Sequence, residues 1–185
     1  MEKVKDGDHC VALRASLNGF VFDFDISLCR GLRDYFTGAM CQPYTEAVMQ
    51  TGFGPVLLYG YMDYWVGSTI YDLKTTMRYD FGKYAHGWQK VFYPWCALES
   101  KAAQSVQRFE YTAVQLRQCG GSYHGTMYPE TYDYHHESAT IALRDMVCRF
   151  IEWLNFRREL ITDRKVFGGV NPPDYTATAI TIDDL

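Results

Sequence analysis

Residues 56–75 read VLLYGYMDYWVGSTIYDLKT, and the fold prediction starts from this stretch. Residues 56–66 are rich in Val, Leu, Tyr and Trp, and β-branched and aromatic residues favour β-strands. Gly67 and Ser68 fit the two-residue turn of a β-hairpin, and residues 69–75 continue as a second strand. The sequence therefore predicts an antiparallel hairpin with Gly67 and Ser68 at its tip.

The pairing register that follows from this turn places two carboxylates opposite each other. Val66 faces Thr69, so further along the hairpin Asp63 faces Asp72. Side chains that face each other directly have Cβ atoms ~4.5–5.5 Å apart, and like charges at that distance destabilise the pair. A divalent cation between the two aspartates would remove this repulsion.

A lysine shares the face of the hairpin that carries the carboxylates. Lys74 lies two residues after Asp72, hence on the same side of the strand, opposite Tyr61. Two interpretations are open. The Asp-x-Lys pattern can belong to a catalytic site, or Asp72 and Lys74 can form an exposed ion pair worth less than ~1 kcal/mol. Taken alone, the pattern favours the ion pair.

Strand and helix patterns alternate on both sides of the hairpin, which predicts an α/β fold. The expected strands cover residues 11–17, 20–24, 46–51, 106–116 and 126–134, and the expected helices cover residues 25–38, 80–100 and 137–161. At 185 residues the chain is long enough for one domain, which we assign to residues 1–162. Residues 163–185 have little periodicity and are expected to form a C-terminal tail.

Composition excludes several classes of protein. Hydrophobic residues make up 48% and charged residues 22%, which is typical of a globular protein and not of a disordered or membrane chain. There is no signal-peptide pattern and no stretch of ~18 apolar residues, so we expect a cytoplasmic protein without a membrane segment. The six cysteines form no C-x-x-C pair, which argues against zinc and iron–sulfur sites. The net charge of −4 still allows a local basic groove.

Three short motifs follow one another in a fixed order: GYMD at residues 60–63, IYDLKT at residues 70–75 and QKVFY at residues 89–93. This set resembles the ordered motifs of the PD-(D/E)XK nucleases. It is most similar to the RecB-like branch, which includes phage and recombination exonucleases and has the signature Asp, Asp-x-Lys-Thr and Gln-x-x-x-Tyr. The resemblance covers about residues 46–93. It implies a mixed central sheet flanked by helices, with a restriction-endonuclease-like αβββαβ core.

The resemblance also implies a role for each motif residue. The metal ligands would be Asp63, Asp72, the backbone carbonyl of Leu73 and, before the hairpin, Glu46, and the ion would be Mg²⁺ or Mn²⁺. Lys74 would be the catalytic lysine. Gln89 and Tyr93 would complete the site from the next helix, where their i, i+4 spacing places them on one face. The upstream histidine of many RecB-like members has no counterpart, since His9 is the only histidine before Asp63.

The resulting functional hypothesis is a Mg²⁺- or Mn²⁺-dependent deoxyribonuclease. We expect it to hydrolyse phosphodiester bonds of DNA in an exonuclease-like manner, in recombination, repair or phage DNA metabolism, because the chain has little length to spare for a base-reading domain. We also expect a homo-oligomer, with the tail touching a neighbour. One alternative is a catalytically inactive nucleic-acid-binding or accessory protein with the same fold. A second alternative is a structural or interaction protein in which the hairpin charges are incidental.

Overall fold

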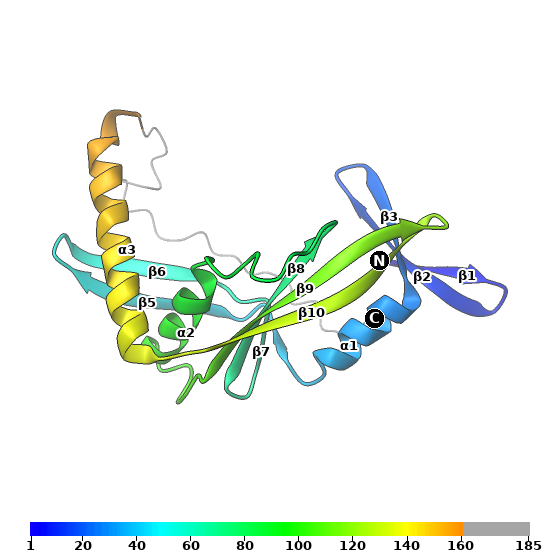
Figure 1. Ribbon diagram of the computed structural model, residues 1–185, viewed down its shortest axis with the longest axis horizontal. Helices are drawn as coiled ribbons and strands as arrows, with labels where there is room; N and C mark the ends of the chain where they lie inside the picture. Colours follow the sequence, from blue (N-terminus) through cyan, green and yellow to red (C-terminus); the bar gives the residue numbers. More distant parts are fainter. Residues whose placement is uncertain (161–185) are drawn as a thin grey trace.

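The computed structural model describes residues 1–160, which form strands and three helices arranged along an elongated body (Figure 1). The strands are β1 Glu2–Asp6, β2 His9–Leu17, β3 Phe20–Asp25, β4 Met40–Cys41, β5 Tyr44–Thr51, β6 Gly54–Tyr61, β7 Tyr64–Val66, β8 Thr69–Thr76, β9 Arg108–Cys119 and β10 Ser122–Asp133. The helices are α1 Ile26–Tyr35, α2 Gln89–Glu99 and α3 His136–Phe156, and a 3₁₀ turn at Arg158–Leu160 follows α3.

The described strands form two sheets, one of which is mixed. Its order is β1-β2-β3-β10-β9-β8-β7-β4, and β5 pairs with β6 in a separate two-stranded sheet. Strand β8 is parallel to β9, and β3 is parallel to β10, while the other pairs are antiparallel. The connection from β8 to β9 runs through α2, as a parallel pair requires a crossover. The prediction of an α/β fold with a mixed central sheet is confirmed.

Helices cover both faces of this sheet. Tyr111 of β9 belongs to a buried cluster that includes Ala97 of α2, so α2 lies on the face to which Tyr111 points. The next residue back, Glu110, points to the opposite face, where it accepts a hydrogen bond of 2.7 Å from the hydroxyl of Tyr35 at the end of α1. Helices α1 and α2 therefore flank the sheet from opposite sides. Helix α3 stands up from one end of the body (Figure 1).

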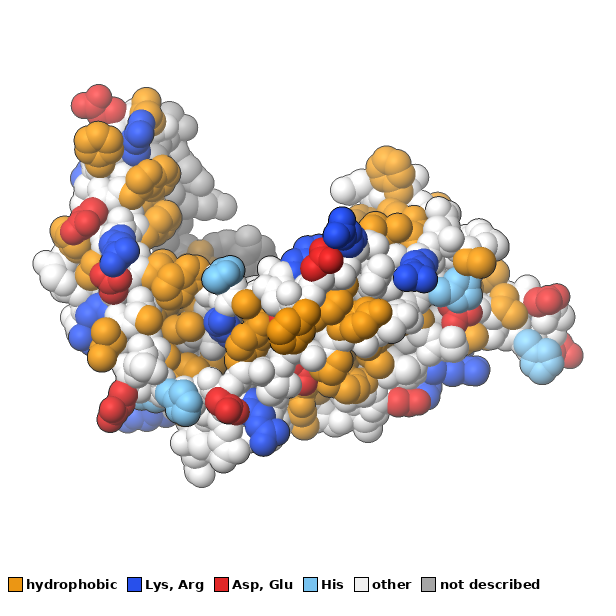
Figure 2. Space-filling model, viewed as in Figure 1, with side chains coloured by type: hydrophobic (Ala, Val, Ile, Leu, Met, Phe, Trp, Pro, Cys, Tyr) orange, Lys and Arg blue, Asp and Glu red, His pale blue; other side chains and the backbone are white. Residues whose placement is uncertain are grey.

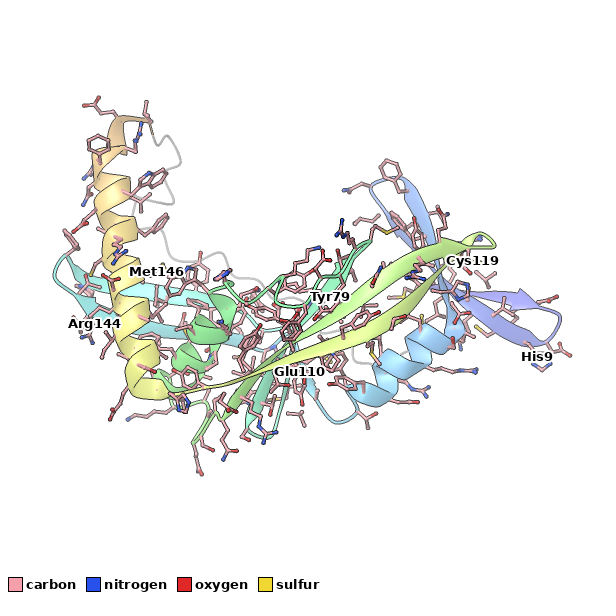
Figure 3. The ribbon with its side chains drawn as sticks, viewed as in Figure 1. His9, Tyr79, Glu110, Cys119, Arg144 and Met146 are labelled. Carbon is pink, nitrogen blue, oxygen red and sulfur yellow. The ribbon has the colours of Figure 1, made fainter. Side chains whose placement is uncertain are left out.

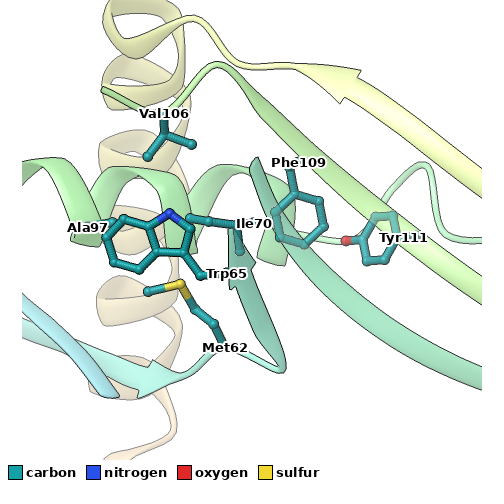
Figure 4. Close-up of a cluster of buried hydrophobic side chains, with 7 residues drawn as sticks. All are labelled: Met62, Trp65, Ile70, Ala97, Val106, Phe109 and Tyr111. Atoms are coloured by element: carbon teal, nitrogen blue, oxygen red, sulfur yellow. The ribbon is translucent and has the colours of Figure 1, made fainter. Parts of the chain in front are cut away.

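Helix α2 joins two hydrophobic clusters. The first lies against the large sheet and contains Met62, Trp65, Ile70, Ala97, Val106, Phe109 and Tyr111 (Figure 4). The second lies between α2, α3 and β5 and contains Ala47, Met49, Trp95, Cys96, Leu143 and Val147. Neighbouring residues of α2, Cys96 and Ala97, enter different clusters and are fully buried. The core therefore fixes α2, and with it the side chains at its N-terminus, against the sheet.

The register of the central hairpin is as predicted, but its first strand is shorter. Val66 pairs with Thr69 and Tyr64 with Tyr71 around Gly67 and Ser68. The single strand expected over residues 56–66 is wrong, because the chain bends at residues 62–63 and divides into β6 and β7, in different sheets. At the bend the backbone pairs with residues 42–43 instead: Gln42 N–H donates to the carbonyl of Asp63, and Met62 N–H donates to that of Pro43. As a result Tyr61 pairs with Tyr44, not with Lys74.

The helix expected over residues 80–100 begins only at Gln89. Residues 77–88 form a loop across the face of the sheet that carries α2. Two glycines explain why: Gly82 has φ +79°, which disfavours other residues, and a Cβ on Gly87 would lie 2.3 Å from the Tyr111 hydroxyl. The aromatic residues of this segment are spaced as in a helix, and this spacing led to the prediction of a helix that is too long at its N-terminus.

Most other elements lie close to their predicted positions. Asp25 caps α1, accepting hydrogen bonds from the backbone N–H groups of Ser27 and Leu28. Strands β1 and β4 were not predicted. The long hairpin of β9 and β10 turns at Gly120–Gly121, next to Cys119 at one end of the body, while Arg144 and Met146 mark α3 at the other (Figure 3). The predicted tail, residues 163–185, lies outside the described residues.

Within residues 1–160, no helix is long and apolar enough to cross a membrane. All six cysteines are free thiols, and only Cys96 is buried.

Candidate active site

Asp63 and Asp72 come together where β7 begins beside β8. Asp63 sits at the bend before β7, and its Oδ2 accepts a hydrogen bond of 2.8 Å from the backbone N–H of Leu73. Asp72 is 2% exposed and lies on the α2 face of β8. The charge of Asp63 raises the pKa of Asp72, so the two carboxylates are electrostatic neighbours. Asp63 lies just before the paired residues of β7, so the direct facing of the two aspartates across the hairpin stays a prediction.

Lys74 and Gln89 contact Asp72 from two sides. The Nζ of Lys74 lies 2.6 Å from Oδ2 of Asp72, and the side chain of Lys74 is 29% exposed. The amide of Gln89, the first residue of α2, donates a hydrogen bond of 2.6 Å to Oδ1. An exposed ion pair between Asp72 and Lys74, the alternative interpretation of the sequence, is therefore excluded, because Asp72 is buried. Lys74 has its head group at the boundary between this buried carboxylate and solvent.

Tyr93 completes the group from the next turn of α2. Burial and the charges of Asp72 and Asp63 raise the pKa of Tyr93, and a hydrogen bond with the Gln89 side chain lowers it. The ring lies against the chain at Gly60, where a Cβ would be 3.1 Å from a ring carbon. Gly60 thus leaves the space that the Tyr93 ring occupies. All five predicted site residues, Asp63, Asp72, Lys74, Gln89 and Tyr93, are gathered at one place.

Burial dominates the electrostatics of the two aspartates. It raises the pKa of Asp63, and the hydrogen bond from Leu73 and the charge of Lys74 only partly oppose it. Burial also raises the pKa of Asp72, against Lys74 and Gln89, which lower it. With both carboxylates ionised, the cluster carries two negative charges and one positive charge. A further cation would therefore stabilise it.

The donor set fits a hard divalent cation. Mg²⁺ retains several waters and commonly binds proteins through one or two carboxylates, and Asp63 and Asp72 offer such a pair. Oδ2 of Asp72 is buried, and the Nζ of Lys74 lies 2.6 Å from it. An ion between the two carboxylates would add to the one positive charge that Lys74 supplies to this buried pair. Chemically, the site suits the binding of a cation and of an anionic oxygen, such as a phosphate, next to Lys74.

Glu46 is not gathered with the other predicted ligands. It is exposed on β5, and its Oε2 accepts a hydrogen bond of 2.6 Å from Tyr44. Within residues 1–160, no three His, Cys, Asp or Glu side chains are grouped so that they could hold a metal ion. The sequence placed Glu46 on a strand but gave no information on which sheet that strand joins. The role of the Leu73 carbonyl stays a prediction, while its N–H holds Asp63.

Tyr111 is a site residue that the sequence analysis missed. Across β8, β9 and β10, Asp72 is in register with Tyr111, and Tyr111 with Glu130, so the three side chains share one row on the α2 face. The Tyr111 hydroxyl is buried without a hydrogen-bond partner, and burial together with the charge of Asp72 raises its pKa. Only the parallel pairing of β8 with β9 brings Tyr111 here, and no local pattern signals it.

We predict that Mg²⁺ or Mn²⁺ stabilises the folded protein through the pair Asp63 and Asp72. Binding to the native state alone raises its stability, and we expect a rise in melting temperature of roughly 5 °C or more at saturating ion. The measurement is thermal unfolding with and without the ion. In the Asp72→Asn variant the shift should vanish, and an equal shift in that variant would exclude this pair as the binding site.

The size of this shift should depend on pH. Because the folded-state pKa of both aspartates is raised above the ordinary value of 3.8, their contribution to the stability of the metal-free protein is present below that value and is lost as pH rises through the folded pKa. The ion binds the ionised form, so the difference in melting temperature with and without Mg²⁺ should grow as the pH rises from the ordinary aspartate value of 3.8 toward neutral pH. A difference that is constant, or larger at the lower pH, would contradict this assignment.

Comparisons with known proteins do not identify a family. Neither a comparison with protein-family models nor one with curated proteins finds a match. Among solved structures, the chain is similar in part to the crystal structure of SSO0001, with a TM-score of 0.42 and 14% sequence identity. The similarity covers 66% of this chain and 55% of the other, so the chain spans about half the length of that protein. A likeness at this level carries no argument about function.

Proposed function

We propose that this protein is a Mg²⁺- or Mn²⁺-dependent nuclease that hydrolyses phosphodiester bonds of DNA. The observation that supports it most is the cluster around Asp72: two neighbouring carboxylates, both with raised pKa, and a lysine whose Nζ is 2.6 Å from one of them. In metal-dependent phosphodiester hydrolysis, two carboxylates can bind the ion, and a lysine can stabilise the charge on the phosphate.

Each residue has a part in the proposed reaction. Asp63 and Asp72 would hold the ion, which when bound polarises the phosphate and lowers the pKa of water. Lys74, whose side chain is 29% exposed, can orient the attacking water and offset the negative charge that develops on the phosphate oxygens in the transition state. Gln89 holds Asp72 by its hydrogen bond of 2.6 Å, and so fixes the direction of the remaining carboxylate lone pairs.

The order of elements around the site supports the finer fold proposal, a restriction-endonuclease-like core. Between α1 and α2 the chain forms strands that end in the β7–β8 hairpin, and β9 follows α2 in parallel with β8. The exonuclease-like mode, a 5′-phosphate on the product and assembly as a homo-oligomer belong to the same proposal. They rest on the motif resemblance of residues 46–93.

The proposal is tested by incubating the purified protein with end-labelled linear, circular and single-stranded DNA, each with Mg²⁺, with Mn²⁺ and with EDTA. We expect shortening of substrates that have ends, only in the presence of the ion, and no cleavage of closed circles. Cleavage of circles would replace the exonuclease mode by an endonuclease mode.

The same experiment separates the nuclease from the inactive alternative. A protein that binds DNA but cleaves none of these substrates with either ion would be an accessory or binding protein. The exposed position of Glu46 is the observation that favours this second candidate, since it leaves the carboxylate pair without a third acidic ligand among the described residues.

A further inference from the structure

The loop of residues 77–88 leads from the end of β8 to the start of α2, and buried contacts hold it in place. The carboxylate of Glu130, which is 4% exposed, accepts a hydrogen bond of 3.0 Å from the backbone N–H of Gly82 and another from the hydroxyl of Tyr79. The ring of Tyr79 stacks on Tyr128 of β10, with ring centres 4.6 Å apart. Figure 3 shows Tyr79 over the central strands.

A second set of bonds closes the loop on itself. The Nζ of Lys83 donates to the hydroxyl of Thr76, at 2.7 Å, and to the carbonyl of Arg78, at 2.9 Å. Thr76 is the last residue of β8, so the loop is tied to the strand that carries Asp72 and Lys74. Hydrogen bonds to Glu130 and from Lys83 therefore hold residues 78–83 in place.

This fixed loop presents an aromatic side chain to solvent. Phe81 lies between Tyr79 and Gly82, both bound to Glu130, yet its side chain is 90% exposed. Trp88, at the other end of the loop, is 46% exposed and directly precedes Gln89, which binds Asp72. Phe81 thus contributes little to the core, although its neighbours are anchored.

The loop lies close to the candidate active site. Asp72, Tyr111 and Glu130 form one row across adjacent strands, and adjacent strands are ~4.8 Å apart, so the anchor of the loop is about 10 Å from Asp72. One or two nucleotides of an extended DNA strand would span this distance. A strand with its phosphate at Lys74 can therefore reach Phe81 with a neighbouring base.

The charge of this segment is opposite to that of the whole chain. Residues 74–90 contain four basic residues, Lys74, Arg78, Lys83 and Lys90, and one acidic residue, Asp80, whereas the whole chain has a net charge of −4. Asp80 forms an exposed ion pair with Arg78. Figure 2 shows hydrophobic side chains gathered over the middle of the body, with Lys and Arg side chains next to them. Exposed aromatic rings among cations are the combination that binds single-stranded nucleic acid, by base stacking and phosphate contacts.

We infer that Phe81 stacks on an unpaired base of the DNA strand that enters the active site, with Trp88 as a second ring nearer to Asp72. This inference rests on the proposed function, because it assigns part of the substrate strand to a place beside the site. The loop would hold the strand end single-stranded, while Lys74 and Lys83 offer positive charge to its phosphates.

The test is binding of a fluorescein-labelled single-stranded DNA of about 12 nucleotides to the full chain in EDTA, followed by fluorescence anisotropy. We expect Phe81→Ala to weaken binding about tenfold, the scale of one lost base–aromatic stack, and Phe81→Trp to keep wild-type affinity. Phe20→Ala serves as the matched control, because Phe20 is also exposed, at 68%, but is the first residue of β3. This control should bind like the wild type.

An oligonucleotide with abasic positions separates stacking from phosphate contacts. The wild type and Phe81→Ala should bind the abasic oligonucleotide equally. The affinity of the two proteins should also depend on salt in the same way, since no phosphate contact is lost. If Phe81→Ala binds normal DNA within twofold of the wild type, or if the wild type binds no DNA, the inference is overturned. It is also overturned if Phe81→Ala instead dissociates an oligomer in light scattering, which would make Phe81 a contact between copies. Because binding is measured without metal, these outcomes are independent of whether the protein cleaves DNA.

Discussion

Replacing Asp72 by Asn is expected to lower Mg²⁺-dependent cleavage of DNA by ~10³-fold or more. The substitution removes a charge that the ion needs, and the ion contributes several kcal/mol of transition-state stabilisation in such reactions. Asn keeps the shape of the side chain and can still accept the hydrogen bond from Gln89, which is 2.6 Å long in the native protein. The loss should therefore appear in turnover and in metal binding, while the folded structure persists. Initial rates on linear DNA measure it.

Asp145→Asn is the matched control for this substitution. Asp145 is an exposed aspartate of α3 that pairs with Arg149 one turn away, far from the β7–β8 hairpin. Its variant should cleave at the wild-type rate. If Asp72→Asn retained more than a tenth of the wild-type rate, Asp72 would not be a ligand of the catalytic ion.

Lys74→Ala is expected to lower turnover by ~10²-fold or more and to leave metal and DNA binding largely intact. The ammonium lies 2.6 Å from Asp72 at the edge of the buried site, where it can contact the attacking water or the phosphate. Removal of a group that acts in the transition state lowers kcat more than it raises KM. The measurement is single-turnover cleavage together with calorimetric binding of Mg²⁺.

Lys5→Ala provides the control for a general loss of positive charge. Lys5 is exposed on β1, at the other end of the large sheet from β8. A rate for Lys74→Ala within threefold of the wild type, on DNA that the wild type clearly degrades, would reject the catalytic role of Lys74. A structural role alone would change the melting temperature and leave turnover unchanged.

The parts of the fold that could be predicted are those fixed by local chemistry. Gly67 and Ser68 set the register of the central hairpin, and Asn18 and Gly19, both with positive φ, turn the hairpin of β2 and β3. The bend after Tyr61 could not be predicted, because it depends on backbone hydrogen bonds to residues 42–43. The same holds for the start of α2, which depends on the fit of Gly87 against Tyr111 of a distant strand.

The residues of the candidate site can likewise be divided into those that local geometry groups and those that only distant strands bring together. Asp63, Asp72 and Lys74 are related by hairpin register, and Gln89 and Tyr93 by helical spacing, so short-range geometry is sufficient to group each set. Tyr111 reaches the site through the parallel pairing of β8 with β9, and Glu130 anchors the neighbouring loop through β10. These are contacts between strands far apart in the sequence. For Glu46, the strand was predicted correctly, but the sheet that this strand joins could not be predicted.

We propose that the pair Asp63 and Asp72 holds a divalent ion that enables DNA cleavage. The most direct measurement is the initial rate of cleavage of linear DNA against Mg²⁺ concentration, for the wild type and Asp72→Asn purified side by side. We expect a saturable dependence on Mg²⁺ for the wild type, no cleavage in EDTA, and no response to Mg²⁺ in the variant. Cleavage that persists in EDTA, or equal rates for the two proteins at every Mg²⁺ concentration, would contradict it.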